Sequence, residues 1–334
     1  MRSYSSASTL RPELPQGHVK MTQPSINSTF DTSLVDLNPN ISFSTTESDP
    51  SDAGMSTTTQ KITTPSPLAQ DLNQNTAQAS QVPPTPIQHM STQAAYDQWA
   101  TVYDTDGNML QSIDNDELNT LLPFFLNQIA STSSPRINVL DLGCGTGRNT
   151  LRFLSHIWPP SKTICVTGLD FSAGMLSLAR AKLSALTSPT TTLRLEHCDP
   201  FPPTRFDPSS LNLSPQDFVI STLVLEHIPL PTFFATLDAL LAPGATALLT
   251  NMHEEMGSRS QAGFVNAEGV KVRGESYVYS LAETVQGAEE AGLRVVQARE
   301  RSVEESDVQK GVVGKRGAKW VGCKVWFGVV VRKA

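Results

Sequence analysis

From Thr92 onward, hydrophobic and polar positions change repeatedly between two patterns. Short apolar runs such as Ile137–Leu142 are typical of buried strands, whereas Met175, Ala179 and Leu183 recur at a spacing of four, which is typical of a helix. These patterns predict helices at about residues 92–103, 114–130, 148–156, 173–186, 231–241 and 281–291, and strands at about 137–142, 163–170, 193–199, 218–223, 246–252, 294–299 and 320–331.

The order of these elements predicts an α/β fold. Strands that are separated by helix-length segments form parallel, doubly wound sheets with helices on both faces. No helix can be read between the last two strands, so we expect them to form an antiparallel pair at one edge of the sheet. A loop-rich insertion at residues 253–280 carries several aromatic side chains and one arginine, and it can form a cap over a small ligand or, equally, a surface excursion.

Composition divides the chain into two parts. Residues 1–90 are rich in Ser, Thr, Pro, Asn and Gln and show neither a strand nor a helix period, so we predict a disordered tail. Residues 91–334 are long enough to bury the core of one domain.

Charge and hydropathy exclude some classes of partner. The net charge of −7 provides no overall attraction for nucleic acids or anionic membranes. No apolar run approaches the ~18 residues that a membrane span requires. We predict a cytoplasmic protein. Mitochondrial import is an alternative, because Arg2, Arg11 and several serines resemble a presequence, but Pro12 and Pro15 would interrupt its helix.

A glycine turn directly follows the first predicted strand. The segment reads Asp141-Leu142-Gly143-Cys144-Gly145-Thr146-Gly147, and its glycines allow positive φ angles and close approach of a ligand to the backbone. A dinucleotide-binding turn needs a third glycine where Arg148 stands, and a phosphate-binding loop needs a Gly-Lys-Ser/Thr sequence that is absent. The turn therefore predicts a pocket of the nucleotide type, formed with the following helix.

The second predicted strand also ends in a carboxylate. Asp170 comes 23 residues after Gly147, where an acid at a strand end can accept hydrogen bonds from both hydroxyls of a ribose. The alternative interpretation is an N-cap of the next helix, although Ser172 can serve that purpose.

The D-x-G-x-G-x-G turn resembles the first motif of class I S-adenosylmethionine (SAM)-dependent methyltransferases. The segment Leu225-Glu226-His227-Ile228-Pro229 resembles the fourth motif of quinone-biosynthesis-type members, and the turn at residues 240–244 is a further landmark. Tyr96-Asp97-Gln98-Trp99-Ala100-Thr101-Val102-Tyr103-Asp104 resembles the helix that closes over the cofactor in this family. The chain also resembles small-molecule methyltransferases of fungal specialised metabolism, which often carry disordered N-terminal extensions.

This resemblance implies SAM as the cofactor and a Rossmann-like sheet of seven strands, mostly parallel with the last strand antiparallel. It also implies that Asp199 contacts the adenine edge, although Asp199 can equally be a turn residue before Pro200. Tyr96 or Tyr103 can cover the methionine end of the cofactor, or both can pack in the core. The predicted cofactor-binding residues are Asp141, Gly143, Cys144, Gly145, Gly147, Asp170, Phe171, Met175, Asp199, Thr222 and Tyr96.

Two histidines are candidates for removing a proton from the methyl acceptor. His227 follows the fourth strand and has an intrinsic pKa near neutrality; it can act as a general base or shape the turn. His253 follows the fifth strand beside two glutamates and is the second candidate. No set of carboxylates converges near the fourth strand, so we expect no metal in the reaction.

The function predicted from the sequence is methyl transfer from SAM to an oxygen or nitrogen of a small molecule, in secondary-metabolite biosynthesis. The alternatives are a protein or nucleic-acid methyltransferase and a non-catalytic SAM-binding regulator. Ser221-Thr222-Leu223-Val224 occupies the place where enzymes that methylate flipped bases have Asn/Asp-Pro-Pro-Tyr/Phe, so we expect no nucleic-acid partner. We expect no membrane partner either, and the sequence makes no prediction of the oligomeric state.

Overall fold

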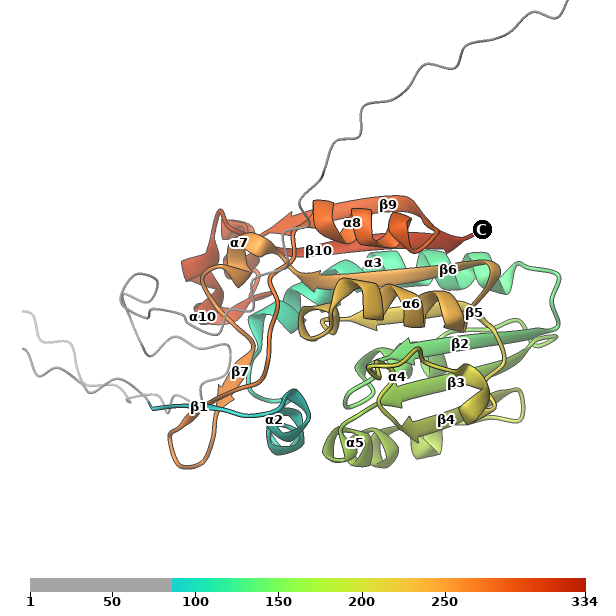
Figure 1. The fold of residues 1–334 in the computed structure, drawn as a ribbon, viewed down its shortest axis with the longest axis horizontal. Coiled ribbons are helices and arrows are strands. Elements are labelled where there is room, and N and C mark those ends of the chain that lie inside the picture. Colours follow the sequence, from blue (N-terminus) through green and yellow to red (C-terminus); the bar gives the residue numbers. More distant parts are fainter. Residues whose placement is uncertain (1–85) are drawn as a thin grey trace, which may run out of the picture.

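The computed structural model describes residues 86–334, apart from the side chains of residues 315 and 316. In this range a seven-stranded sheet carries helices on both faces, and a small three-stranded sheet lies beside it (Figure 1). The strands of the main sheet are β2 (Arg136–Leu142), β3 (Thr163–Asp170), β4 (Thr191–His197), β5 (Gln216–Thr222), β6 (Leu241–Met252), β9 (Leu293–Ser302) and β10 (Lys324–Lys333).

The topology of the main sheet confirms the predicted fold. Its strand order is β4-β3-β2-β5-β6-β10-β9, and every pair from β4 to β6 is parallel. The last strand, β10, runs antiparallel to both β6 and β9. This arrangement brings the carboxyl ends of β2, β3 and β5 to the same edge of the sheet, where ligands bind in folds of this type.

Helices cover the two faces of the sheet because side chains alternate along each strand. On β5, Phe218 and Ile220 pack with the helices of one face, whereas Val219 packs with those of the other. The first face carries α3 (Met109–Ala130) and α4 (Arg148–Ser155), and the second carries α6 (Leu230–Leu240) and α8 (Leu281–Glu290). A further helix, α5 (Ala173–Leu183), packs beside β3 and β4.

Several predicted boundaries need correction. The helix predicted at 92–103 is α2 (Thr92–Trp99), and α3 begins at Met109 rather than 114, because the side chain of Asn108 caps it by accepting from Leu110 N–H (3.0 Å). The strand predicted at 246–252 begins at Leu241, directly after α6. Two short helices, α9 (Glu305–Gln309) and α10 (Gly314–Gly317), lie between β9 and β10, where none was predicted.

The insertion at residues 253–280 contains regular structure. It consists of α7 (Glu254–Gly257) and the antiparallel strands β7 (Gly263–Val265) and β8 (Lys271–Arg273). Most of the predicted tail lies outside the described residues, but its end forms β1 (Ile87–His89), which pairs in parallel with β8. The short 3-10 helices are η1 (Ser184–Leu186), η2 (Pro208–Leu211), η3 (Leu225–His227) and η4 (Ala318–Trp320).

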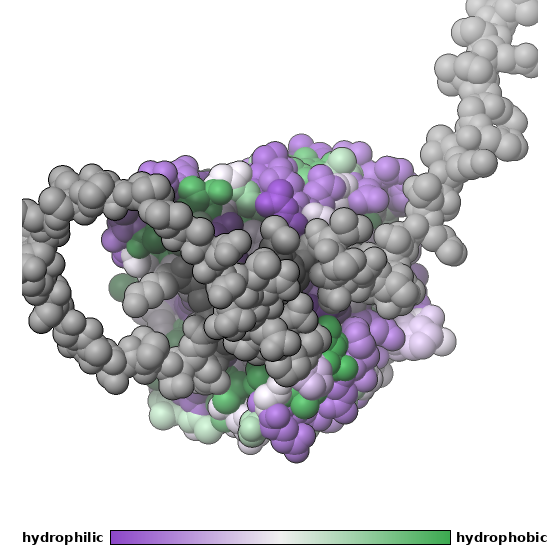
Figure 2. Space-filling view, turned by 90° about the vertical axis from the view of Figure 1, so that its left-hand side faces the viewer, coloured by the Kyte–Doolittle hydropathy of each residue, from purple (hydrophilic) through white to green (hydrophobic). Residues whose placement is uncertain are grey.

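The surface that looks to the left in Figure 1 is mixed in character. Hydrophilic residues prevail along its upper part, and the visible hydrophobic residues form separate small patches (Figure 2). Among residues 86–334, none of the helices has both the length and the hydropathy that a bilayer crossing requires.

Candidate functional site

A cavity of about 340 Å³ lies at the carboxyl ends of β2, β3 and β5. Its walls come from α2, the glycine turn after β2, the ends of β3 and β5, η3 and the insertion. The structure brings eight of the predicted site residues into this lining: Tyr96, Gly143, Gly145, Asp170, Phe171, Asp199, Thr222 and His227.

The three glycines of the turn have positive φ angles but different surroundings. A Cβ atom on Gly143 would lie 2.4 Å from Val224, and one on Gly147 would lie 2.6 Å from Leu183. A Cβ on Gly145 would meet no atom within 4 Å, and Gly145 lines the cavity. Packing therefore requires the outer two glycines, whereas the middle one keeps space open for a ligand.

Asp170 ties the glycine turn to the end of β3. Its buried carboxylate accepts hydrogen bonds from the backbone N–H groups of Gly145 (2.7 Å) and Ser172 (2.8 Å), while burial raises its pKa. The cap of α5 is Ser172, whose hydroxyl accepts from Met175 N–H (3.1 Å). The carboxylate at the strand end thus holds the turn from inside the cavity and is not the helix cap.

Asp199 lies two residues beyond β4, since the strand predicted to end at 199 ends at His197. It lines the cavity, and its carboxylate also accepts from Phe201 N–H (2.8 Å). Asp199 is therefore both a turn residue and part of the cavity lining.

Four predicted site residues lie beneath or beside the turn instead of in the lining. Asp141 is buried and accepts from the Thr150 hydroxyl (2.7 Å), and burial raises its pKa to about 6. The side chain of Cys144 fills space against Gly168, Gly147 is the N-cap of α4, and Met175 packs in the core below α2.

His227 joins three elements at the cavity. One ring nitrogen, Nδ1, lies 2.8 Å from the carbonyl oxygen of Glu275 in the insertion, and the other, Nε2, lies 2.8 Å from the Tyr96 hydroxyl on α2. A carbonyl oxygen only accepts, so Nδ1 carries the proton and Nε2 accepts from Tyr96. Burial lowers the pKa of His227 to about 4, and the ring is neutral at physiological pH.

His253 lies outside the lining of the cavity. Its Nδ1 accepts from Glu255 N–H (3.0 Å) and so caps α7, while Nε2 lies 2.8 Å from a carboxylate oxygen of Glu300. Both ring nitrogens therefore have partners that hold the start of the insertion to β9.

The lining contains residues that sequence reasoning missed, notably Gln93 and Glu275. Both tyrosines considered for the methionine end, Tyr96 and Tyr103, line the cavity, whereas nothing in the sequence distinguished Glu275 from other polar residues of the insertion. The amide of Gln93 donates to the carbonyl of Phe171 (2.8 Å) and holds α2 against the cavity.

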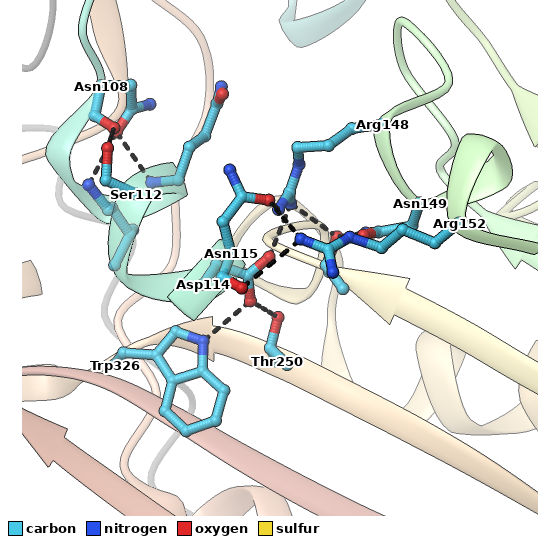
Figure 3. A network of polar contacts seen from close by, with 12 residues as sticks. Asn108, Ser112, Asp114, Asn115, Arg148, Asn149, Arg152, Thr250 and Trp326 are labelled. Atoms are coloured by element: carbon cyan, nitrogen blue, oxygen red, sulfur yellow. Dashed lines mark hydrogen bonds and ion pairs between the residues drawn. The ribbon is translucent and has the colours of Figure 1, made fainter. Parts of the chain in front are cut away.

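Arg148 anchors the cavity wall to the rest of the fold (Figure 3). Its guanidinium donates to the buried carboxylate of Asp114 on α3 (2.6 Å) and to the Thr222 hydroxyl (3.0 Å). The other oxygen of Asp114 accepts from Thr250 (2.6 Å) and from the Trp326 indole (2.8 Å). The residue that breaks the dinucleotide pattern therefore pairs with Asp114, the hub of a network that joins α3, α4, β5, β6 and β10.

The sequence of the chain is similar to those of known proteins. A family model described as a methyltransferase domain matches residues 140–247. The chain is 40% identical over 268 residues to an uncharacterized methyltransferase of Emericella nidulans, covering 73% of this chain and 91% of that relative. A 2-phytyl-1,4-naphtoquinone methyltransferase of Synechococcus elongatus is 32% identical over 170 residues, or 49% of this chain and 64% of the relative.

Solved structures include a SAM-dependent methyltransferase from Mesorhizobium loti. It has 18% sequence identity and a TM-score of 0.44, and the match covers 65% of this chain and all of that chain.

Proposed function

Because the chain belongs to the class I SAM-dependent methyltransferases, with SAM as cofactor, we propose that it methylates an oxygen or nitrogen atom of a small-molecule acceptor. The observation that carries this proposal is the shape of the cavity. The glycine turn and Asp170 line one part of it, while Tyr96, His227 and Glu275 line another. A cofactor and an acceptor can therefore meet in one cavity.

The residues at the turn fit the cofactor. Space over Gly145 admits a ligand against the backbone, and Asp170 offers a carboxylate at a strand end, where ribose hydroxyls bind in related sheets. When bound, SAM supplies a methyl group that its sulfonium activates. The protein then has to align the acceptor and exclude water.

The cap over the cavity supports a small acceptor. The N-terminal end of α2 and the insertion are joined where Glu275 N–H donates to the Thr92 hydroxyl (3.1 Å), and both residues line the cavity. A peptide or nucleic-acid chain would have to displace this contact. The role in secondary-metabolite biosynthesis and the cytoplasmic location rest on the sequence alone.

We further propose that an acceptor that arrives protonated passes its proton through Tyr96 to His227. The hydroxyl of Tyr96 donates to Nε2, so its oxygen retains a lone pair that can accept from an O–H or N–H group. His227 would then act as a base through the tyrosine. If His227→Ala and His227→Gln both retain most of kcat with the true acceptor, this role is wrong.

Calorimetric titration of SAM and its demethylated product tests the cofactor site. We expect micromolar binding that Asp170→Ala abolishes, with Glu289→Ala, an exposed position on α8, as the matched control. A folded wild-type chain that binds neither compound contradicts the proposal.

A screen of phenols, carboxylic acids and amines, followed by mass spectrometry, tests the acceptor class. Peptides and RNA are included as macromolecular acceptors. Transfer only to macromolecules would favour the alternative enzyme classes, and SAM binding without transfer to any compound would favour a non-catalytic regulator.

A further inference from the structure

Glu226 is a buried carboxyl group beside the cavity that the proposed chemistry has not used. Its side chain is 3% exposed, and its Oε2 has no hydrogen-bond partner within residues 86–334. Its Oε1 lies 3.8 Å from Nε2 of His227, the same nitrogen that accepts from Tyr96. Because buried polar groups are almost always hydrogen-bonded, a carboxyl group in this position requires an explanation.

The backbone on both sides fixes Glu226 in place. Its N–H donates to the side chain of Asn251 at the end of β6 (3.1 Å), and its carbonyl accepts from Tyr277 N–H in the insertion (2.6 Å). Neither contact involves the carboxyl group. The backbone therefore places that group beside His227, and these contacts give it no partner.

The carboxyl group borders a second, smaller cavity of about 10 Å³, close to the space that one water molecule needs. Tyr96, Tyr103 and Leu223 line both this cavity and the larger one, so they separate the two. An acceptor bound in the larger cavity would therefore be separated from Glu226 by these three residues, with His227 in contact with Tyr96.

Glu226 is the group in this cluster that titrates just above neutral pH. Burial raises its pKa to about 8 and lowers the pKa of His227 to about 4. Burial also raises the pKa of both tyrosines. The charges of Glu226, Asp106 and Asp170 raise it further, whereas the Arg148 guanidinium lowers the pKa of Tyr103. The other residues around the small cavity are uncharged: Trp99, Asn108, Leu110, Leu223, Met252 and Ala262.

The charge of Glu226 decides whether His227 can take up a proton. With a neutral carboxylic acid at 3.8 Å, protonation of the buried imidazole would create an isolated cation in a low-dielectric site. With a carboxylate at that distance, the imidazolium gains an opposite charge and is stabilised.

We propose that Glu226 acts through His227 as the second member of a proton-accepting pair, and that the ionised carboxylate enables the imidazole to receive the acceptor's proton. This inference rests on the proposed function. The acceptor's O–H or N–H bond breaks as its proton moves to the Tyr96 oxygen, and the original Tyr96 proton moves to Nε2. The electron pair left on the acceptor would form the new bond to the methyl carbon of bound SAM while the bond from that carbon to sulfur breaks, its electron pair staying on the sulfur of the demethylated product. His227 would later release the proton to water.

The pH profile of kcat/KM for the acceptor tests the inference. For the wild type we expect a rise with an apparent pKa near 8. Glu226→Gln keeps the size of the side chain but removes the charge; we expect it to lower kcat/KM at high pH by ~100-fold and to abolish the rise, because a positioned base contributes on this order. Glu226→Asp should restore a rise. A Glu226→Gln profile that matches the wild type overturns the inference.

A structural defect is separated from a chemical one by SAM affinity, which Glu226→Gln should retain, and by melting temperature, which it should not lower. Because the folded pKa of Glu226 lies above the unfolded value, its ionisation costs stability as pH rises from about 4.5 to about 8. Glu226→Gln should therefore melt at a higher temperature than the wild type at pH 8, and melting well below the wild type at that pH contradicts this account.

Nitrogen-15 NMR of the His227 ring in the full chain gives a readout without turnover. We expect its shifts to change with a midpoint near pH 8 in the wild type but not in Glu226→Gln. Turnover of a small acceptor without this coupling overturns the inference and leaves the proposed function standing. Coupling without transfer to any small acceptor overturns the proposed function and, with it, the role of the pair.

Discussion

At the scale of single residues, Gly145 and Gly269 share a backbone conformation but not an environment. Both have positive φ angles, 53° and 76°, and neither has an atom within 4 Å of the position that a Cβ would take. Gly269 lies in the turn between β7 and β8, whereas Gly145 faces the cavity. The same substitution therefore has the same backbone cost at both positions and a different effect on binding.

We predict that Gly145→Ala and Gly269→Ala each destabilise the fold by roughly 1 kcal/mol, the cost of a left-handed conformation for a residue with a Cβ. Only Gly145→Ala should weaken SAM binding, by at least tenfold, because its methyl group occupies ligand space. Thermal denaturation and calorimetry measure the two effects. Equal SAM affinity in both variants would show that the cofactor does not lie over Gly145.

At the scale of elements, α2 depends on polar contacts for its position. With eight residues it is too short to be stable alone. Asp97 accepts hydrogen bonds from the Ser172 hydroxyl (2.6 Å) and the Gly174 N–H (3.0 Å), and so fastens α2 to the start of α5. The helix that carries Tyr96 is thereby held over the cavity.

We predict that Asp97→Ala releases α2 and weakens SAM binding several-fold, mainly through faster dissociation, with little change in melting temperature. The control is Gln98→Ala, which changes an exposed side chain on the same helix. Stopped-flow displacement measures the dissociation rate. An unchanged rate in Asp97→Ala would mean that the helix does not restrain the cofactor.

The Asp114 network determines how α3 joins the sheet. Removing the buried carboxylate of Asp114 leaves the Arg148 guanidinium without its ion-pair partner. We predict that Asp114→Ala costs about 3–5 kcal/mol of unfolding free energy, as for other broken buried pairs. Thr250→Val removes one neutral donor of nearly the same shape and should cost about 1 kcal/mol. Urea denaturation gives both values, and similar losses in the two variants would contradict the central role of Asp114.

At the scale of the whole molecule, the three-stranded sheet links the two segments that cover the cavity, α2 and the insertion at residues 253–280. β1 precedes α2 directly, and it pairs with β8, which precedes Glu275. The strand order β1-β8-β7 therefore fixes both the N-terminal end of α2 and the end of the insertion, which meet at the hydrogen bond from Glu275 N–H to the Thr92 hydroxyl.

Two truncated chains test this link. A chain that begins at Pro86 keeps β1, and we predict that its melting temperature and SAM affinity equal those of the full chain. A chain that begins at Met90 lacks β1, and we predict a several-fold loss of SAM affinity, because β8 loses its parallel neighbour. Calorimetric titration of SAM into both chains measures the two affinities. Equal affinities would show that β1 does not support the cap.

The sequence by itself determined the main sheet and the part of the cavity lining that lies at the carboxyl ends of its strands. Apolar runs and glycines act locally, and the parallel topology then brings the ends of β2, β3 and β5 together wherever the side chains point. For this reason the strand bounds of β3 were predicted to the residue, and Gly143, Gly145, Asp170 and Thr222 were assigned to a site that the fold assembles at one edge.

Only the tertiary structure decided what those side chains do. Asp141 and Met175 have motif positions but lie beneath the cavity, and His253 is held by Glu255 and Glu300. The β1–β8 pairing and the Tyr96–His227–Glu275 contacts join segments far apart in the chain, and no local period encodes such pairing. Hydrogen-bond partners and desolvation depend on the packed interior, so tautomers and pKa values could be assigned only after the fold was known.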